Sequence, residues 1–97
     1  MDKEFIKSTI NKNRGILSNY GVKSFAIFGS FVRGRQSKRS DIDFLVEFKK
    51  ATFRNYMGLL HSLEDMFGRN IDLVTKKSLG RRVRPYILKE AEYIEGR

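Results

Sequence analysis

The sequence has no cysteine, and this absence excludes disulfide bonds and metal sites built from thiolates. Its single histidine, His61, is expected to be a partly buried structural residue, because the other ligands of a zinc site are missing. No apolar run is long enough to span a bilayer, and the first fifteen residues lack the apolar core of a signal peptide. We therefore expect an intracellular, cytoplasmic protein that makes no membrane contact.

Acidic residues are scarce relative to basic ones, eleven against twenty, which gives a formal net charge of +9. This excess favours an anionic partner such as a nucleotide, a nucleic acid or an acidic protein. Hydrophobic residues make up 40% of the chain and charged residues 32%, which is typical of a globular protein. Because 97 residues build only a small core, we expect 1–97 to form a single domain.

Periodic apolar positions predict a chain in which helices and strands alternate. We expect helices over 3–17, 53–67 and 84–91, a short helix from Ser30, strands over 24–28, 41–48, 70–75 and 92–95, and a loop over 34–40. Asp2 is placed to begin the first helix, Gly68 to end the second, and Pro85 falls in the first turn of the last. This order predicts a small α/β fold in which helices cover a sheet.

The most informative stretch is FGSFVRGRQSKRSDIDFLVEF, residues 28–48. Side chains alternate between the two faces of a strand, so Asp41 and Asp43 project to the same side. Carboxylates held so close repel each other, and a divalent cation removes the repulsion. Mg²⁺ is the best candidate, because one or two carboxylates together with substrate phosphates are enough to bind it.

A third carboxylate, Asp72, lies within the apolar strand segment NIDLV. An unpaired charge is costly to bury there, so we expect Asp72 to face an open site or a metal. If its strand neighbours the strand over 41–48, three aspartates converge. Such a cluster can hold two Mg²⁺ ions, and the sequence therefore predicts a two-metal site.

Gly29 and Ser30 precede the aspartate pair and are suited to binding phosphate. Glycine lets a phosphate approach the backbone, and a helix that begins at Ser30 would aim free N–H groups at an anion. Further cations lie in the intervening loop, at Arg33, Arg35, Lys38 and Arg39. The stretch thus reads as a strand, a phosphate clamp, a basic loop and a metal-binding strand.

At these residues the sequence resembles the nucleotidyltransferase superfamily of DNA polymerase β, and in particular its smallest members, the minimal nucleotidyltransferase (MNT) domains. The resemblance rests on Gly29-Ser30, the following Asp41-x-Asp43 and the later Asp72, and it covers most of the chain. It implies a small mixed sheet flanked by helices, and an enzyme that uses ATP and two Mg²⁺ ions.

The resemblance also implies a role for each motif residue. Asp41 and Asp43 would bind both metal ions, and Asp72 would complete the shell of the catalytic one and assist deprotonation of the acceptor hydroxyl. The implied nucleotide-binding residues are Gly29, Ser30, Arg33 and Ser40.

Many prokaryotic MNT proteins are paired with a small helical HEPN protein, an RNase toxin. By resemblance, this chain would be the antitoxin, transferring AMP from ATP to a tyrosine hydroxyl of its HEPN partner. An oligomer would then form through the partner complex. RNA is a secondary candidate partner.

Simpler interpretations stand beside these. Asp41 and Asp43 also suit the end of a loop, Gly29 an ordinary turn and Ser30 an ordinary helix cap. The basic loop and a second cluster, Arg81, Arg82 and Arg84, are typical of solvated surface or of contacts with an acidic partner or RNA. The main alternative function is a non-catalytic antitoxin or RNA-binding module that works by contact alone. A small-molecule acceptor is a third interpretation.

Overall fold

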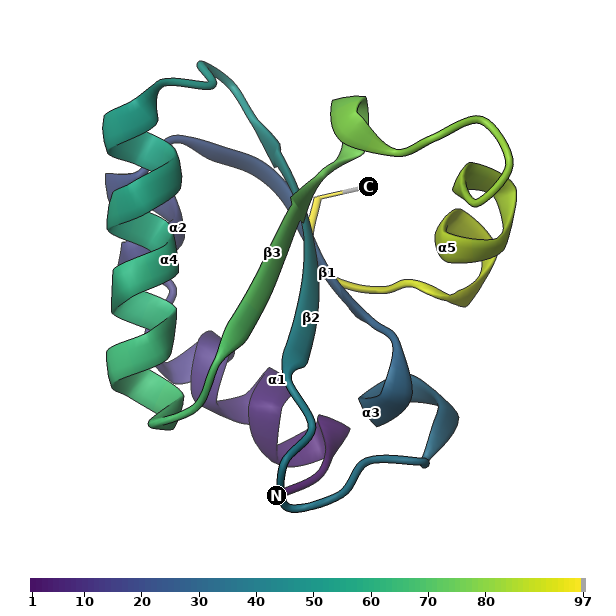
Figure 1. Cartoon of the computed structure of the whole chain (residues 1–97). Helices are drawn as coiled ribbons and strands as arrows, with labels where there is room; N and C mark the ends of the chain where they lie inside the picture. Colours follow the sequence, from purple (N-terminus) through teal and green to yellow (C-terminus); the bar gives the residue numbers. More distant parts are fainter. Residues whose placement is uncertain (97) are drawn as a thin grey trace.

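A computed structural model describes residues 1–96 and shows a four-stranded mixed sheet with helices on both faces (Figure 1). The elements in chain order are α1 (Lys3–Lys12), α2 (Gly15–Asn19), β1 (Val22–Phe28), α3 (Ser30–Arg33), β2 (Ile42–Phe48), α4 (Phe53–Phe67), β3 (Ile71–Thr75), the 3₁₀ helix η1 (Lys76–Ser78), α5 (Arg84–Glu90) and β4 (Glu92–Glu95). The strand order is β3-β2-β1-β4, with β2 and β3 parallel and the other pairs antiparallel. The α/β fold predicted from the sequence is confirmed.

The first helix differs from its prediction, because the single helix expected over 3–17 is two helices. Asp2 begins α1 as predicted, accepting a hydrogen bond from the Phe5 amide at 2.9 Å. Asn13 leaves the helical conformation, and its side-chain amide donates to the Thr9 carbonyl. Asparagine competes in this way with backbone hydrogen bonds, so the helix ends there and α2 starts in a new direction.

Helix α4 matches its predicted bounds at both ends. The Thr52 side chain accepts a hydrogen bond from the Asn55 amide at the start, and Gly68 adopts a left-handed conformation at the end, with φ of 59°. One expectation on this helix is wrong. His61 is exposed on its outer face, as is Phe53, which is 75% exposed, because both lie outside the stripe that faces the sheet.

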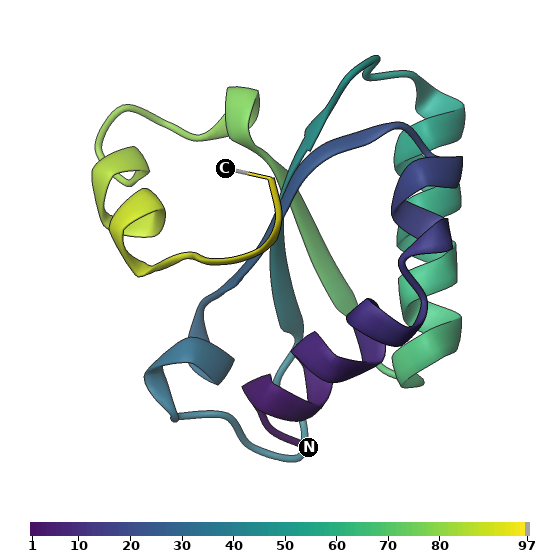
Figure 2. The same ribbon diagram turned by 180° about the vertical axis from the view of Figure 1, so that it is seen from behind.

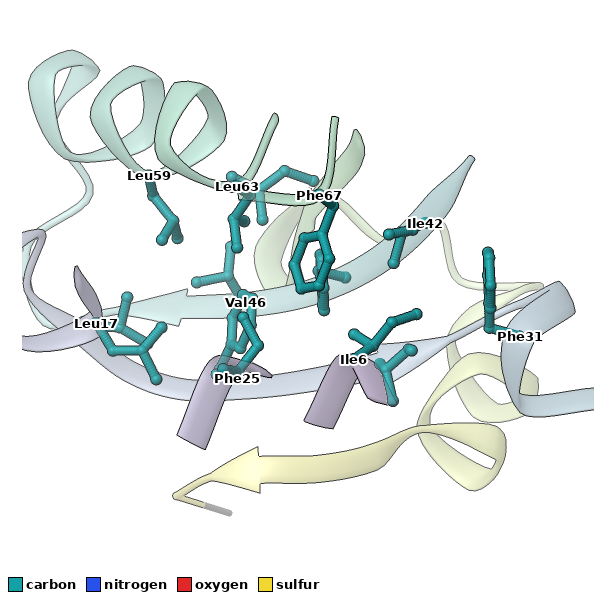
Figure 3. Close-up of a cluster of buried hydrophobic side chains, with 14 residues drawn as sticks. Ile6, Leu17, Phe25, Phe31, Ile42, Val46, Leu59, Leu63 and Phe67 are labelled. Carbon is teal, nitrogen blue, oxygen red and sulfur yellow. The ribbon is translucent and has the colours of Figure 1, made fainter. Parts of the chain in front are cut away.

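The two faces of the sheet are covered unequally (Figures 1 and 2). Helices α1, α2 and α4 pack on one face, where fourteen buried residues form the main core (Figure 3). The opposite face carries a smaller cluster of three buried residues, Ala26, Phe28 and Leu45, against which Ile87 and Leu88 of α5 pack. We call these the thick face and the thin face. No helix within residues 1–96 has the length and apolar character needed to cross a membrane.

Candidate active site

The central feature of the thin face is a pair of aspartates on neighbouring strands. Asp43 on β2 lies directly opposite Asp72 on β3 in the parallel register, as the sequence predicts if the two strands are neighbours. Alternation along the strands directs Phe44 and Leu73 into the main core, so the two aspartates project from the thin face. Asp43 is partly buried and Asp72 is exposed, which agrees with the expectation that Asp72 faces an open site.

Gly29, directly after β1, lies against Asp43. In the antiparallel register Phe28 is opposite Asp43, so the following turn passes beside the Asp43 carboxylate. Gly29 has φ of 81°, and a Cβ atom at this position would lie 2.0 Å from Asp43 Oδ2. No side chain fits in that space, and non-glycine residues rarely adopt this backbone conformation. The contact explains why the motif requires glycine before Ser30.

The Asp43 carboxyl holds its proton unusually strongly. Its pKa is raised from 3.8 to about 6, first by burial and then by the charge of Asp72, a hydrogen bond with Asp72 and the charge of Asp41. The positive charge of Arg33 lowers the pKa and so opposes this shift. An ionised Asp43 therefore lies in a field of negative charge, and a cation at this point would stabilise all the carboxylates together.

The phosphate side of the site is built from Gly29 and the short helix α3, which begins at Ser30 as predicted. The Gly29 amide donates to Glu90 Oε2 at 2.7 Å, and Arg33 Nη1 donates to Glu90 Oε1 at 2.6 Å. We call the Gly29 amide and the Arg33 guanidinium the clamp. Arg33 was predicted as a phosphate contact, but Glu90 was not. The only sign of Glu90 in the sequence is that it is an acidic residue in the last turn of a helix, where the helix dipole disfavours negative charge.

The basic loop after α3 is held by Ser40 and Arg69. The Ser40 hydroxyl accepts a hydrogen bond from the Ser37 amide at 2.7 Å, and the Ser40 carbonyl accepts one from Arg69 at 3.1 Å. Arg69 also lies 5.5 Å from the ring centre of Phe31. Ser40 thus contacts Ser37, within the loop, and Arg69. Arg69 was not predicted, because its partners are distant in sequence.

Asp41 precedes β2 and is exposed. It borders a polar groove of about 410 Å³, whose lining residues are Lys38, Arg39, Asp41, Gly68, Arg69 and Asn70. This groove joins the predicted basic loop to the acidic site.

Within residues 1–96, no group of three or more acidic, histidine or cysteine side chains is close enough together to hold a metal ion by itself. The Asp43 and Asp72 pair nevertheless fits Mg²⁺, because this ion needs only one or two carboxylates when substrate phosphates supply the other ligands. The bare Gly29 backbone beside Asp43 leaves room for such a phosphate. The donor set is all oxygen, as Mg²⁺ prefers.

Two curated relatives cover nearly all of the chain. A Methanocaldococcus jannaschii protein, provisionally named a protein adenylyltransferase, is 43% identical over 91 residues, covering 90% of this chain and 88% of that protein. The protein adenylyltransferase MntA of Thermococcus cleftensis is 33% identical over 93 residues, covering 94% of each.

Solved structures share the fold. A protein described provisionally as a minimal nucleotidyltransferase superposes with a TM-score of 0.82, at 30% identity and 95% coverage of each chain. Two more distant structures show likeness of fold alone. One is a toxin–antitoxin complex with AMP-PNP, with a TM-score of 0.73, 22% identity, and coverage of 90% of this chain and 73% of that chain. The other is an MNT antitoxin bound to a tri-AMPylated HEPN toxin of Shewanella oneidensis, with a TM-score of 0.66, 18% identity, and coverage of 92% and 71%.

The family model described as nucleotidyltransferase domain matches residues 10–94. This span includes Gly29, Ser30 and the three motif aspartates, Asp41, Asp43 and Asp72. The match, the relatives and the shared fold agree with the geometry of the thin face. The chain belongs to the nucleotidyltransferase domain family and is a minimal nucleotidyltransferase.

Proposed function

We propose that the chain is a Mg²⁺-dependent protein adenylyltransferase that transfers AMP from ATP to a tyrosine hydroxyl of a HEPN-type toxin, and that it acts as the antitoxin of that toxin. The observation that carries the proposal is the Asp43 and Asp72 pair, set in register beside the bare backbone of Gly29. The names of the adenylyltransferase relatives support the group transferred. The solved complex with an AMPylated HEPN toxin supports the partner.

The residues of the site have distinct roles in this proposal. The Gly29 amide, the Ser30 hydroxyl and the Arg33 guanidinium bind oxygens of the triphosphate, with Ser40 as a further nucleotide-binding residue. Asp43 and Asp72 would hold Mg²⁺ together with the phosphates of ATP, and Asp41 would join them as a further ligand. The bound ion would neutralise the phosphates and lower the pKa of the acceptor hydroxyl. Asp72, which is exposed, accepts the proton of that hydroxyl.

The reaction is an in-line displacement at the α-phosphate. The acceptor oxygen forms a bond to the α-phosphorus while the bond to the bridging oxygen of the β-phosphate breaks. Pyrophosphate leaves with that bridging oxygen, and in this proposal Arg33 stabilises the negative charge that it gains. We further infer that residues 1–97 form one domain, since every strand of the described part of the chain joins a single sheet.

Intact-mass measurement of a HEPN partner tests the proposal. The partner is incubated with this protein, ATP and Mg²⁺, and wild type is compared with Asp43→Ala and with Asp65→Ala. Asp65 is an exposed aspartate of α4, on the thick-face side, so its variant controls for the loss of one carboxylate. We expect the partner to gain one or more AMP units with wild type and Asp65→Ala only. Transfer by Asp43→Ala would contradict the proposed mechanism.

A second candidate function is inhibition by contact alone, and the net charge of +9 with a basic groove beside Asp41 favours it. In this case the partner, or an RNA, binds the positive side chains and no group is transferred. A variant with all three aspartates replaced by alanine distinguishes the two functions. Neutralisation of the toxin by that variant would support contact, whereas its loss, with the complex still formed, would support catalysis.

A further inference from the structure

The Glu90 carboxylate, at the end of α5, occupies the clamp. Each of its oxygens accepts one hydrogen bond, from the Gly29 amide at 2.7 Å and from Arg33 at 2.6 Å. A carboxylate that engages a backbone amide and a guanidinium in this way uses the same donors as a phosphate would. In the described structure, an acidic side chain thus takes the place that the proposed function assigns to the triphosphate.

The position of Glu90 is not explained by the energetics of its own helix. Glutamate at the carboxyl end of a helix is disfavoured by the helix dipole. The Glu90 carboxylate is stabilised instead by its hydrogen bonds to the two donors, one of which is 61 residues away in sequence. The Glu90 side chain is 20% exposed and that of Arg33 is 53% exposed, so the ion pair lies at the mouth of the site and can be reached from solvent.

Helix α5 is weakly anchored, which allows this contact to open. The helix has no buried residue, whereas α4 buries Leu59, Leu63 and Phe67. Only the partly buried Ile87 and Leu88 join it to the small cluster of the thin face. Moving the Glu90 side chain off the clamp therefore disturbs little packing.

We propose that Glu90 gates the clamp by occupying it as an internal phosphate mimic, and that the phosphates of ATP displace it on binding. This inference rests on the proposed function for the identity of the clamp. It adds a residue that competes with the nucleotide for the same donors. The affinity for nucleotide then depends on how much more strongly the clamp binds phosphate than it binds the Glu90 carboxylate. Removing the charge of Glu90 therefore strengthens nucleotide binding.

The test is the affinity of the full chain for ATP in the presence of Mg²⁺, measured by calorimetry without any acceptor. Glu90→Gln keeps the shape of the side chain and an oxygen that can accept from the Gly29 amide, but removes the charge that competes with phosphate. We expect the Kd to fall by about fivefold. An unchanged or higher Kd would overturn the proposal and make Glu90 a support of the clamp instead.

Glu92→Gln is the matched control. It causes the same change in net charge two residues further on, but Glu92 pairs with Lys3 at 2.8 Å and with Lys7, both on α1. We expect its Kd for ATP to equal that of wild type. A fall equal to that of Glu90→Gln would show a general effect of net charge and would count against gating.

A titration of the wild-type protein with inorganic triphosphate decides the matter if Glu90→Gln does not fold. In NMR spectra, the Gly29 amide and the Glu90 carboxyl are expected to shift together as the anion replaces the carboxylate. A Gly29–Glu90 hydrogen bond that persists at saturation would overturn the proposal. ATP binding that tightens in Glu90→Gln, without transfer to any HEPN partner, would sink the proposed function and leave the gate intact.

Discussion

The thick and thin faces of the sheet share the same strands but are built from different kinds of interaction. On the thick face, three helices bury a continuous cluster that includes Phe25 and Phe44, whose rings stack with centroids 4.7 Å apart. On the thin face, three buried residues and a lightly anchored helix lie beside two facing aspartates. Hydrophobic stabilisation is therefore concentrated on one side of β2, which allows the other side to carry charges that oppose folding.

The largest expected effect is the loss of AMP transfer when Asp43, at the centre of the thin face, is replaced. Asp43→Asn keeps the size of the side chain but removes the charge that would bind the metal. We expect AMP transfer to fall by about a thousandfold or more, which corresponds to several kcal/mol of transition-state stabilisation. Rates are measured with radiolabelled ATP and a HEPN acceptor. Near-normal transfer, with a circular dichroism spectrum like that of wild type, would remove Asp43 from the mechanism.

The next largest effect is expected from a substitution in the core of the thick face, and it is a loss of stability. Phe44→Ala deletes a fully buried ring, and we expect the free energy of unfolding to fall by about 3 to 5 kcal/mol. Leu88→Ala deletes a partly buried side chain that packs on the thin face, and we expect a loss of about 1 kcal/mol. Urea denaturation of both variants measures the contrast directly. Equal losses would show that the two faces contribute alike to stability.

A smaller effect is expected at the junction of strand and clamp. Gly29→Ala places a methyl group 2.0 Å from Asp43 Oδ2 and forces alanine to a φ of 81°. We expect a destabilisation of about 1 to 3 kcal/mol, together with loss of ATP binding. Gly34→Ala is the control: Gly34 has a φ of 71°, but a Cβ atom added there would meet no neighbouring atom within 4 Å. Comparable loss of ATP binding in both variants would assign the effect to backbone strain rather than to the contact with Asp43.

The smallest expected effect is a pH dependence of stability. The pKa of Asp43 is about 6 in the folded chain, above the ordinary 3.8, so the folded state binds this proton more tightly than the unfolded state does. Ionised Asp43 thus opposes folding above pH 6, and this cost disappears as the pH falls through 6 toward 4.

Asp43→Asn removes that cost. We expect it to stabilise the metal-free protein at pH 7.5 by about 1 kcal/mol, or roughly 4 to 8 °C in Tm, after allowance for solvent screening. The gain should shrink toward zero near pH 4. Differential scanning fluorimetry across this range, with Asp65→Asn as the control, checks the sign. A variant less stable than wild type at pH 7.5 would show that the Asp43 charge is already compensated.

Local patterns in the sequence predicted the bounds of helix α4 and drew attention to the aspartates that the fold brings together. The bounds of α4 follow from a strong apolar period with Thr52 and Gly68 at its ends. The spacing of Asp41 and Asp43 indicated a shared face, and only the pairing of β3 with β2 had to be assumed to bring in Asp72. The bounds of α4 and the spacing of the aspartate pair depend on residues close together in the chain.

Features that depend on distant contacts could not be predicted in this way. Asn13 ends α1 where its side chain bonds the Thr9 carbonyl, and nothing in the apolar period marks that point. Glu90 reaches Gly29 only because β4, which follows α5, pairs with β1. The residue pattern of one segment does not indicate which distant strand that segment pairs with. Whether Ser40 contacts a nucleotide stays a prediction.

The register of β2 gives its aspartates a second consequence, for the specificity of folding. A shift of one residue along either neighbouring strand would turn Asp43 into the space beneath α4 and bring Phe44 out to the thin face. Such a misaligned sheet would have to bury a carboxylate in hydrocarbon, at a cost of several kcal/mol. The aspartates that weaken the native sheet therefore disfavour its misaligned forms more strongly. The charge on β2 adds to the apolar alternation of the strand in favouring one alignment.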